Sequence, residues 1–353
     1  MQAEFARQYL RCPVCRRDRT MRLQAGESDE REVREGTLIC GACGAQQPVH
    51  RGVGHLLLDA PEHVAREAAG LQRFADYMRA DGWTREKVRK LPDIDDGYWY
   101  VQGVSINQLL TTVRFEPRQT LLDVGSNTCW ASNYFAARGL HVIALDIATA
   151  ELQGLYTADY FIDDGTSYFE RVLGSMYDMP VASGSLDHVY CCEVLHHNDT
   201  ESLRRTFEEA FRVLKPGGKL LVVNETLKTV RDPIGVHTEG VAQFEGYEHA
   251  HWALRYRAEA IRAGFSTRLL EPSYHWFFRT PPTSKPPLSP WRQRALFELR
   301  SHRWGRKGYL AWINHVAGGV SFGMIATKSP HVPPIRSALV ALRDLRPRAA
   351  RSG

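Results

Sequence analysis

Two carboxylates lie in two short apolar runs of the chain, at a spacing that could bind a nucleoside. The first run, TLLDV, contains Asp123, and the second, HVIALD, ends at Asp146. Apolar, β-branched runs of this length are typical of buried parallel strands. An acid at the end of the second strand can accept hydrogen bonds from ribose hydroxyls. We therefore predict that Asp146 binds a ribose.

The residues between these runs predict a turn followed by a helix. The turn begins at Gly125 and includes Asn127, and both residue types tolerate positive φ at low cost. Residues 131–138 have helical composition and precede Gly139, a typical helix stop. A dinucleotide fingerprint would need glycine where the chain has Asn127 and Trp130. The alternatives are a mononucleoside site or an α/β core without a ligand.

Four cysteines form a second group, with the spacing of metal ligands. They belong to two CxxC pairs separated by a polar, charged loop: Cys12, Cys15, Cys40 and Cys43. Four thiolates at this spacing suit a structural Zn²⁺ in tetrahedral geometry, and disulfides do not suit a reducing cytosol. Such a site has no open coordination position, so we predict that it is structural and supports folding of a short domain.

Four segments together resemble the class I S-adenosylmethionine (SAM)-dependent methyltransferases. DVGSNTC resembles motif I, usually DxGxGxG, with Asn127 and Cys129 in place of the second and third glycines. FERVLGSMYDMP is similar to the family's third-strand motif, and SLDHVYCCEVLHH to its fourth strand. RVLKPGGKLLV resembles the turn into the fifth strand. The resemblance implies an α/β fold with a seven-stranded Rossmann-like sheet, and SAM as the cofactor.

The resemblance also implies which residues bind SAM. They are Asp123, Gly125, Asn127, Asp146, Ile147, Ser175, Met176, Asp178 and Glu193. Ser175 stands where an adenine-binding acid is common, so Asp178 could supply that acid, and Met176 is expected to pack on the adenine.

Two histidine-containing segments could supply a general base. His196 follows the fourth strand, but this position has a histidine in relatives with many substrates, so it could instead shape the pocket. Glu248 and His249 follow the fifth strand, where they could act as orienting group and base. Alternatively, Glu248 stabilises a helix N-terminus. We predict that His249 is the more specific base.

The N-terminal segment has its own resemblance, which covers about residues 8–60. LRCPVC and TLICGACGAQQPVHRGVGHLLL resemble the small zinc-ribbon activators of tRNA and rRNA methyltransferases. They are also similar to the ribbon of bacterial rRNA guanine methyltransferases. Such a ribbon binds a partner, a substrate or its own catalytic domain, or is a structural cap.

The predicted organisation has four parts. These are a zinc ribbon (1–60), a helical connector and pocket-covering segment (61–118), a methyltransferase domain (119–330) and a basic tail (331–353). The third part contains an insertion, 272–316, rich in Pro, Trp and Arg. This insertion could bind RNA or an anionic carrier, act as a lid, or form a homodimer contact.

Composition narrows the class of protein. The chain has 353 residues, 43% hydrophobic and 24% charged, with a formal net charge of +5. These values are typical of a globular protein, and the mild charge does not require nucleic acid. No apolar run reaches membrane-spanning length and the N-terminus lacks a signal-peptide pattern, so we predict a cytoplasmic protein without membrane association.

The predicted function is methyl transfer from SAM to an O or N atom of a small molecule, such as a sugar or secondary metabolite. The aromatic, His-rich segment after the fifth strand favours it, and no NPPY-type amino-methylation motif follows the fourth strand. One alternative is an rRNA or tRNA methyltransferase, which the ribbon and the insertion favour. The other is a binding module whose SAM site has decayed, suggested by Asn127 and Cys129. The acceptor atom, the use of a base and the oligomeric state stay open.

Overall fold

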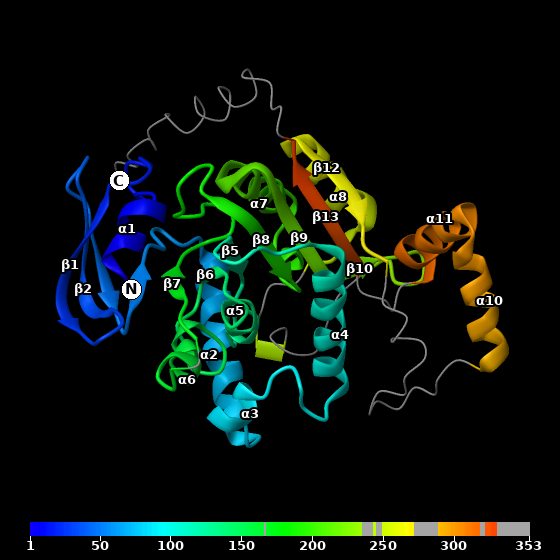
Figure 1. Ribbon diagram of the computed structural model, residues 1–353, viewed down its shortest axis with the longest axis horizontal. Helices are drawn as coiled ribbons and strands as arrows, with labels where there is room; N and C mark the ends of the chain where they lie inside the picture. The colour runs from blue at the N-terminus through cyan, green and yellow to red at the C-terminus, as the bar shows by residue number, and fades with distance from the viewer. Residues whose placement is uncertain (166, 235–242, 245–248, 272–288, 318–321, 330–353) are drawn as a thin grey trace.

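The computed structural model describes residues 1–165, 167–234, 243–244, 249–271, 289–317 and 322–329. These residues form an α/β structure around one large sheet, with helices on both faces (Figure 1). The tail 331–353, Glu248 and the start of the insertion, 272–288, lie outside the described residues. None of the described helices combines the length and apolarity needed to cross a bilayer.

The central part of the sheet has the predicted seven strands. They are β5 (Thr120–Val124), β6 (His141–Asp146), β7 (Glu170–Leu173), β8 (Leu186–Cys192), β9 (Leu214–Glu225), β12 (Phe265–Leu269) and β13 (Phe322–Lys328). Their order is β7-β6-β5-β8-β9-β13-β12. The first five are parallel, and β13 runs antiparallel between β9 and β12. The predicted seven-stranded Rossmann-like sheet is therefore confirmed.

The sheet has eleven strands in all, because the cysteine-containing segment extends it. That segment consists of α1 (Ala3–Tyr9), β1 (Met21–Ser28), β2 (Val33–Cys40), β3 (Gln46–His50) and β4 (Val53–His55). Strand β4 pairs in parallel with β7, from Val53 opposite Arg171 to His55 opposite Leu173. The ribbon is thus continuous with the methyltransferase sheet through backbone hydrogen bonds.

A buried ion cluster reinforces this junction. Arg171 of β7 is fully buried and pairs with Glu32 of the ribbon and with Asp159. Asp159 also accepts from Arg34 at 3.2 Å and from Arg51 at 2.8 Å. Burying a charge is costly unless opposite charges and hydrogen bonds compensate it. The ribbon and the core therefore each supply charges that the other requires.

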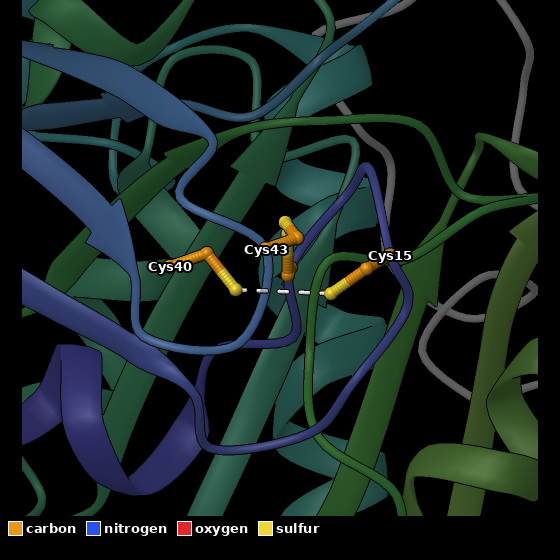
Figure 2. A group of neighbouring side chains, drawn as sticks. Cys15, Cys40 and Cys43 are labelled. Carbon is orange, nitrogen blue, oxygen red and sulfur yellow. Dashed lines mark hydrogen bonds between the residues drawn. The ribbon is translucent and has the colours of Figure 1, made fainter.

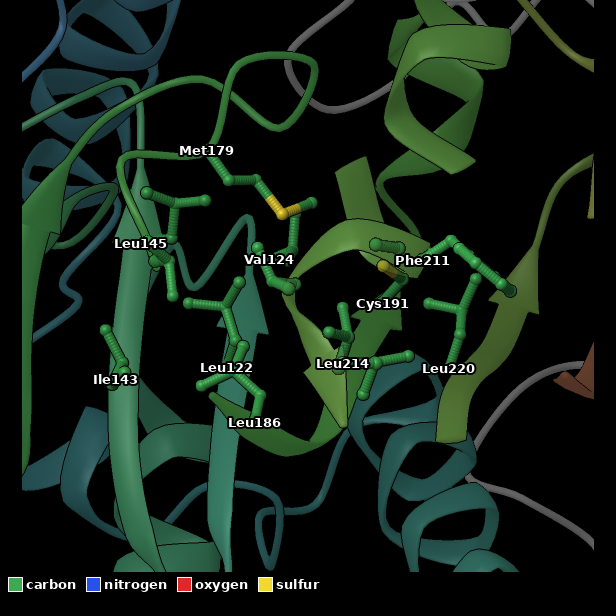
Figure 3. Close-up of a cluster of buried hydrophobic side chains, with 14 of the residues drawn as sticks. Leu122, Val124, Ile143, Leu145, Met179, Leu186, Cys191, Phe211, Leu214 and Leu220 are labelled. Carbon is green, nitrogen blue, oxygen red and sulfur yellow. The ribbon is translucent and has the colours of Figure 1, made fainter. Parts of the chain in front are cut away.

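Alternating side chains of the strands build two cores, one on each face of the sheet. On one face, Leu122 and Leu145 pack with Met179 and with Phe211 of α7 (Thr200–Val213), as Figure 3 shows. Helices α1, α7 and α8 (Ala253–Ala263) contribute to this core. Burial of a Leu or Phe side chain contributes roughly 1.5–3 kcal/mol. The helices that cover the cavity described below contribute none of the described residues of this core.

The other face is covered by α2 (Glu62–Ala80), α4 (Gly97–Thr112) and α5 (Trp130–Ala136), which pack on Leu121, Val142 and Tyr190. Short elements complete it: α3 (Arg85–Arg89), η1 (Leu155–Ala158) and α6 (Asp159–Ile162). Asp96 caps the N-terminus of helix α4, and its side chain accepts from the amides of Tyr98 and Trp99. This cap fixes two aromatic residues of the predicted connector above the carboxyl ends of the strands.

The remaining described elements follow β8 and β9. They are η2 (Leu195–His197), β10 (Leu227–Lys228), β11 (His251–Trp252), α10 (Pro290–Ser301), α11 (Arg303–Trp312) and the π-helical turn η4 (Ile313–Ala317). Strands β10 and β11 form a separate two-stranded sheet. Helices α10 and α11 lie in the predicted insertion, between β12 and β13, and project from the body of the molecule (Figure 1).

We expect Arg171→Ala to destabilise the whole protein, because it removes the fully buried cation that Glu32 and Asp159 share. The free energy of unfolding should fall by about 3–5 kcal/mol, the usual cost of breaking a buried ion pair. Urea unfolding measures it. Arg7→Ala is the matched control: it removes an exposed pair with Glu4 and should change stability by less than about 0.5 kcal/mol. Equal effects of the two variants would contradict the role of the cluster.

Candidate functional site

A cavity of about 920 Å³ opens at the carboxyl ends of the parallel strands. Ligands of open α/β sheets bind at this edge, and the volume lies at the upper end of small-molecule pockets. The ends of β5, β6, β8 and β9 contribute to the lining, together with α2 and α4. The predicted residues that line it are Asp123, Gly125, Asn127, Asp146, Ile147, Met176, Glu193 and His196.

Asp146 fixes the turn after β5 through its carboxylate. Oδ2 accepts from the amide of Asn127 at 2.8 Å, and Oδ1 accepts from the amide of Ala148 at 3.0 Å. Burial raises the pKa of Asp146 to about 6, although these amides oppose the shift. Each carboxylate oxygen has a further lone pair, so both can still accept from ribose hydroxyls.

The turn has the backbone conformation that motif I requires. Gly125, Asn127 and Cys129 have φ values of +68°, +45° and +56°. At Gly125 a Cβ atom would collide with the side chain of Val194, so glycine is required there for packing as well. Asn127 tolerates positive φ, and its Nδ2 donates to Gln153 Oε1 at 2.7 Å. Two replaced glycines are therefore compatible with the turn.

Asp123 links β5 to α5. Its Oδ2 accepts from Ser132 Oγ at 2.6 Å, and only 2% of the residue is exposed. Burial raises the pKa of Asp123 to about 7, against the hydrogen bond from Ser132. The side chain positions the strand–helix turn and lines the cavity.

The structure does not bring Ser175 and Asp178 into the cavity lining. Ser175 is buried, and its Oγ accepts from the amide of Tyr177 at 3.3 Å. Asp178 accepts from Arg16 of the ribbon at 3.0 Å and so contributes to the junction with the ribbon. Met176 lies between them and does line the cavity. Asp178 therefore does not line the cavity, and its role at the adenine stays a prediction.

Glu193 follows β8 in a left-handed conformation, with φ of +50°. This conformation is uncommon for glutamate and turns the chain at the cavity edge. Its Oε2 accepts from the hydroxyl of Tyr98 at 2.6 Å. Tyr98 comes from α4, so the hydrogen bond joins the covering segment to the strand ends.

Two histidine–glutamate pairs lie side by side in the cavity lining. His196 Nδ1 lies 3.1 Å from Glu225 Oε2, and His197 Nδ1 lies 2.8 Å from Glu67 Oε1. The centroids of the two imidazole rings are 4.4 Å apart. A carboxylate at Nδ1 orients an imidazole and leaves Nε2 as the atom that can accept a proton. We had not predicted that Glu67 and Glu225 would pair with these two histidines, because α2 and β9 are far from η2 in sequence.

Glu225 has a further structural task. It is fully buried and accepts from the amides of Val194 and Leu195 at 2.8 Å, as well as from that of His196 at 3.2 Å. Burial alone would raise the pKa of Glu225, but the hydrogen bond from His196 and the backbone amides outweigh it and lower that pKa. Glu225 thus determines the conformation of η2 and holds His196 within it.

His249 does not line the cavity. Its amide donates to the carbonyl of His196 at 2.6 Å, and its side chain is exposed. The predicted partner Glu248 lies outside the described residues. The backbone of His249 therefore contacts the backbone of His196.

The four ribbon cysteines converge. Their sulfur atoms all lie within 4.8 Å of one another, and Cys12–Cys43 and Cys15–Cys40 are both 3.7 Å apart. Figure 2 shows Cys15, Cys40 and Cys43 pointing toward one another from two loops. Sulfur atoms around a tetrahedral Zn²⁺ with bonds of about 2.3 Å lie about 3.8 Å apart. The donor set fits this metal and is far from disulfide geometry.

Comparisons with known proteins agree with this geometry. Residues 122–222 match a family model described as "Methyltransferase domain". The part of the chain that forms the parallel strands therefore resembles a methyltransferase domain. A curated relative, the biotin biosynthesis bifunctional protein BioHC of Cellvibrio japonicus (strain Ueda107), is 33% identical over 105 residues. The match covers 30% of this chain and 19% of that protein, so the chain spans about a fifth of its relative.

Solved structures give likenesses of fold alone. PH0226 protein from Pyrococcus horikoshii OT3 has a TM-score of 0.45 at 14% identity, covering 72% of this chain and 99% of that one. A chain in the complex of the Haloferax volcanii Trm112 methyltransferase activator with a methyltransferase has a TM-score of 0.46 at 17% identity, covering 73% and 97%. Geranyl diphosphate C-methyltransferase from Streptomyces coelicolor A3(2) has a TM-score of 0.43 at 16% identity, covering 65% and 79%.

We expect Asp146→Ala to weaken SAM binding by about 1.5–3 kcal/mol, the range for hydrogen bonds to a charged group. The variant removes the ribose acceptor and releases the amides of Asn127 and Ala148. Isothermal titration calorimetry with SAM measures the loss. Asp163→Ala, an acid outside the cavity lining, is the control. Unchanged affinity in a folded Asp146→Ala protein would exclude Asp146 as a SAM ligand.

Cys40→Ser should reduce bound zinc from one equivalent to below one, because three thiolates hold Zn²⁺ more weakly than four. Metal analysis of protein purified without chelator measures it. Cys192→Ser changes a cysteine outside the quartet and should leave the zinc content unchanged. Absence of zinc from the unmodified protein would contradict the assignment.

Proposed function

We propose that this protein transfers the methyl group of SAM to an oxygen or nitrogen atom of a neutral or cationic small molecule, for which a sugar or secondary metabolite is the leading candidate. The observation that carries the choice of acceptor is the charge of the cavity. Its described lining contains seven acids: Glu67, Asp96, Asp123, Asp146, Glu193, Glu225 and Asp232. Among the described lining residues there is no lysine or arginine.

This charge distribution favours some ligands over others. Binding of RNA depends on cations that neutralise phosphates, and an acidic cavity repels them. The same acids favour the positive sulfur of SAM and a neutral or cationic acceptor. Burial raises the pKa of Asp123 to about 7 and that of Asp146 to about 6, so Asp123 contributes only part of a negative charge at neutral pH.

Aromatic side chains supply the remaining surface for an acceptor. Helices α2 and α4 contribute Phe74, Tyr77, Tyr98 and Trp99 to the lining. Trp99 packs edge-on against Trp130 of α5, with ring centroids 6.0 Å apart. Flat apolar rings bind the faces of sugars and aromatic metabolites, and they also attract cations. The covering segment is therefore the part of the cavity that we assign to the acceptor.

The chemistry requires little covalent help from the protein. When bound, SAM supplies an activated methyl group on a positive sulfur. The turn at Gly125 and Asp146 would hold the nucleoside, and the covering helices would exclude water and align the acceptor with the methyl group. The acidic residues of the cavity favour binding of the positively charged sulfur of SAM before the methyl group is transferred.

His197 is our candidate for the group that removes a proton from the acceptor. Glu67 holds its Nδ1 at 2.8 Å, and both residues line the cavity. His196 is a weaker candidate because Glu225 holds it through both its ring and its amide. His249 does not line the cavity. Zinc in the ribbon, if bound, would have a structural role only.

Two alternatives remain for the experiment to separate. An RNA methyltransferase would use the basic helices α10 and α11 rather than the acidic cavity to bind its substrate. A SAM-fold binding module would not catalyse transfer at all. The test is incubation of the protein with SAM labelled in its methyl group and a cell extract, followed by separation of RNA, protein and metabolites. Label in the metabolite fraction supports the proposal. Label in RNA overturns the acceptor, and SAM binding without any transfer overturns the activity.

His197→Ala should lower turnover by about 10²–10⁴-fold while SAM affinity stays within a fewfold, as expected for loss of a general base. Glu67→Gln should give a smaller loss, because the imidazole remains but is held less firmly. The measurement is transfer to the acceptor identified above, as a function of pH. His249→Ala is the control and should lose no more than a fewfold. A larger effect of His249→Ala would show that the base is His249.

A further inference from the structure

Two helices of the insertion form a basic and aromatic projection, which we call the hairpin (residues 290–317). It contains six lysine and arginine residues and a single acid, Glu298. Its formal charge of +5 equals that of the whole 353-residue chain, so the rest of the chain is formally neutral. Figure 1 shows α10 and α11 at the side of the molecule, away from the ribbon. The cavity does not explain this concentration of charge.

One side of the hairpin is anchored to the body. Arg300 is 4% exposed, and both it and Arg306 bind Glu271, at 2.7 and 3.0 Å. Tyr309 and Ile313 are buried. The carbonyl of His315 accepts from the amide of Val230 at 2.9 Å. These contacts fix the hairpin and determine which side chains remain outside.

The outer side carries large apolar residues that contribute nothing to the core. Trp304 is 78% exposed and Trp291 is 67% exposed; the others are Phe297, Leu299 and Trp312. Cations accompany them: Lys307 lies over the ring of Trp304 and Arg292 over that of Trp291. Several large exposed apolar residues on one projecting element indicate a binding surface. Trp together with Lys and Arg on short helices, of which α11 is amphipathic, is the composition of segments that lie at a membrane surface.

We propose that the hairpin binds the surface of a bilayer that contains anionic lipids. Its cations are attracted to the negative headgroups, and its tryptophans suit the interface between headgroups and acyl chains. Single-stranded nucleic acid is held in positively charged grooves with stacked bases, whereas this surface projects from the molecule. A deformable planar surface therefore matches its shape and charge better.

The hairpin also adjoins the cavity. Val230 and Arg231 donate their amides to His315 and Val316 of the hairpin, at 2.9 and 3.3 Å. Thr229 and Asp232, on either side of these two residues, line the cavity. A bilayer bound by the hairpin would thus lie close to the segment that borders the cavity. Membrane binding itself does not depend on the proposed methyl transfer.

The experiment is flotation of the full-length protein with vesicles. One set contains phosphatidylcholine alone, and the other contains about one third phosphatidylglycerol, at about 0.15 M salt. The unmodified protein should float with the anionic vesicles, and less so at higher salt. The double variant Trp304→Ala with Lys307→Glu should lose at least about tenfold in partitioning. Trp291→Ala with Arg292→Glu tests α10 independently.

A matched control changes one exposed apolar residue and one exposed cation elsewhere: Leu254→Ala with Arg114→Glu, whose side chains lie outside the hairpin. It should bind as the unmodified protein does, and thermal unfolding should show that all variants are folded. The proposal is overturned if the unmodified protein does not bind anionic vesicles, or if both hairpin variants bind them as well as the control. Hairpin-dependent binding of oligouridine without vesicle binding would overturn it in favour of nucleic acid.

Discussion

The cavity depends on one constraint, the need of buried carboxylates for hydrogen-bond donors. Parallel strands end at one edge of the sheet, and in this chain β5, β6 and β9 carry an acid at or near that end. An unpaired buried carboxylate is costly, so backbone amides and a hydroxyl from the adjoining loops must approach each one. Asp146 thereby fixes the turn after β5, and Glu225 fixes η2 after β8. The loops that form the cavity take their shape from these acids.

The need of buried charges for partners also applies where β4 pairs with β7, and there it joins the ribbon to the core. Arg171 lies on β7, yet it needs Glu32 from the ribbon as well as Asp159 from the core. Gly52, with φ of +74°, leaves no room for a Cβ beside these charges. The ribbon forms one sheet with the rest of the chain and shares a buried ion cluster with it. These contacts hold the ribbon in place in addition to any bound metal. The ribbon therefore packs against the rest of its own chain, which is one of the alternatives that the sequence left open.

The sequence predicted what local patterns determine. The resemblance of four motifs to a known family implied the seven-stranded fold, and the CxxC spacing predicted a quartet of cysteines that the structure brings together. Asn127 was expected to accept positive φ and does so. Each of these features depends on residues close together in the chain or on a regular repeat. The placement of Asp146 at the cavity follows from the same reasoning, because the carboxyl ends of parallel strands all lie at one edge of the sheet.

What the sequence did not predict depends on pairing between distant segments. Asp178 was expected at the adenine, but Arg16 of the ribbon binds it. Glu67 on α2 was one acid among many, and only the packing of α2 over η2 makes it the partner of His197. The extension of the sheet through β4 likewise depends on three residues without a distinctive pattern. Single sequences contain little information about such contacts, because many charged residues could satisfy the same partner.

Acidic and basic side chains occupy separate regions of this molecule, and a few ion pairs lie between these regions. The cavity lining is acidic, whereas the hairpin next to it is basic. Glu271 binds Arg300 and Arg306, the two hairpin cations directed to the body, and its carbonyl accepts from Gln108 of α4. That carboxylate lies against both guanidinium groups and so reduces their effect on the acidic potential of the cavity. Glu271 therefore allows one domain to present an acidic interior site and a basic outer surface at the same time.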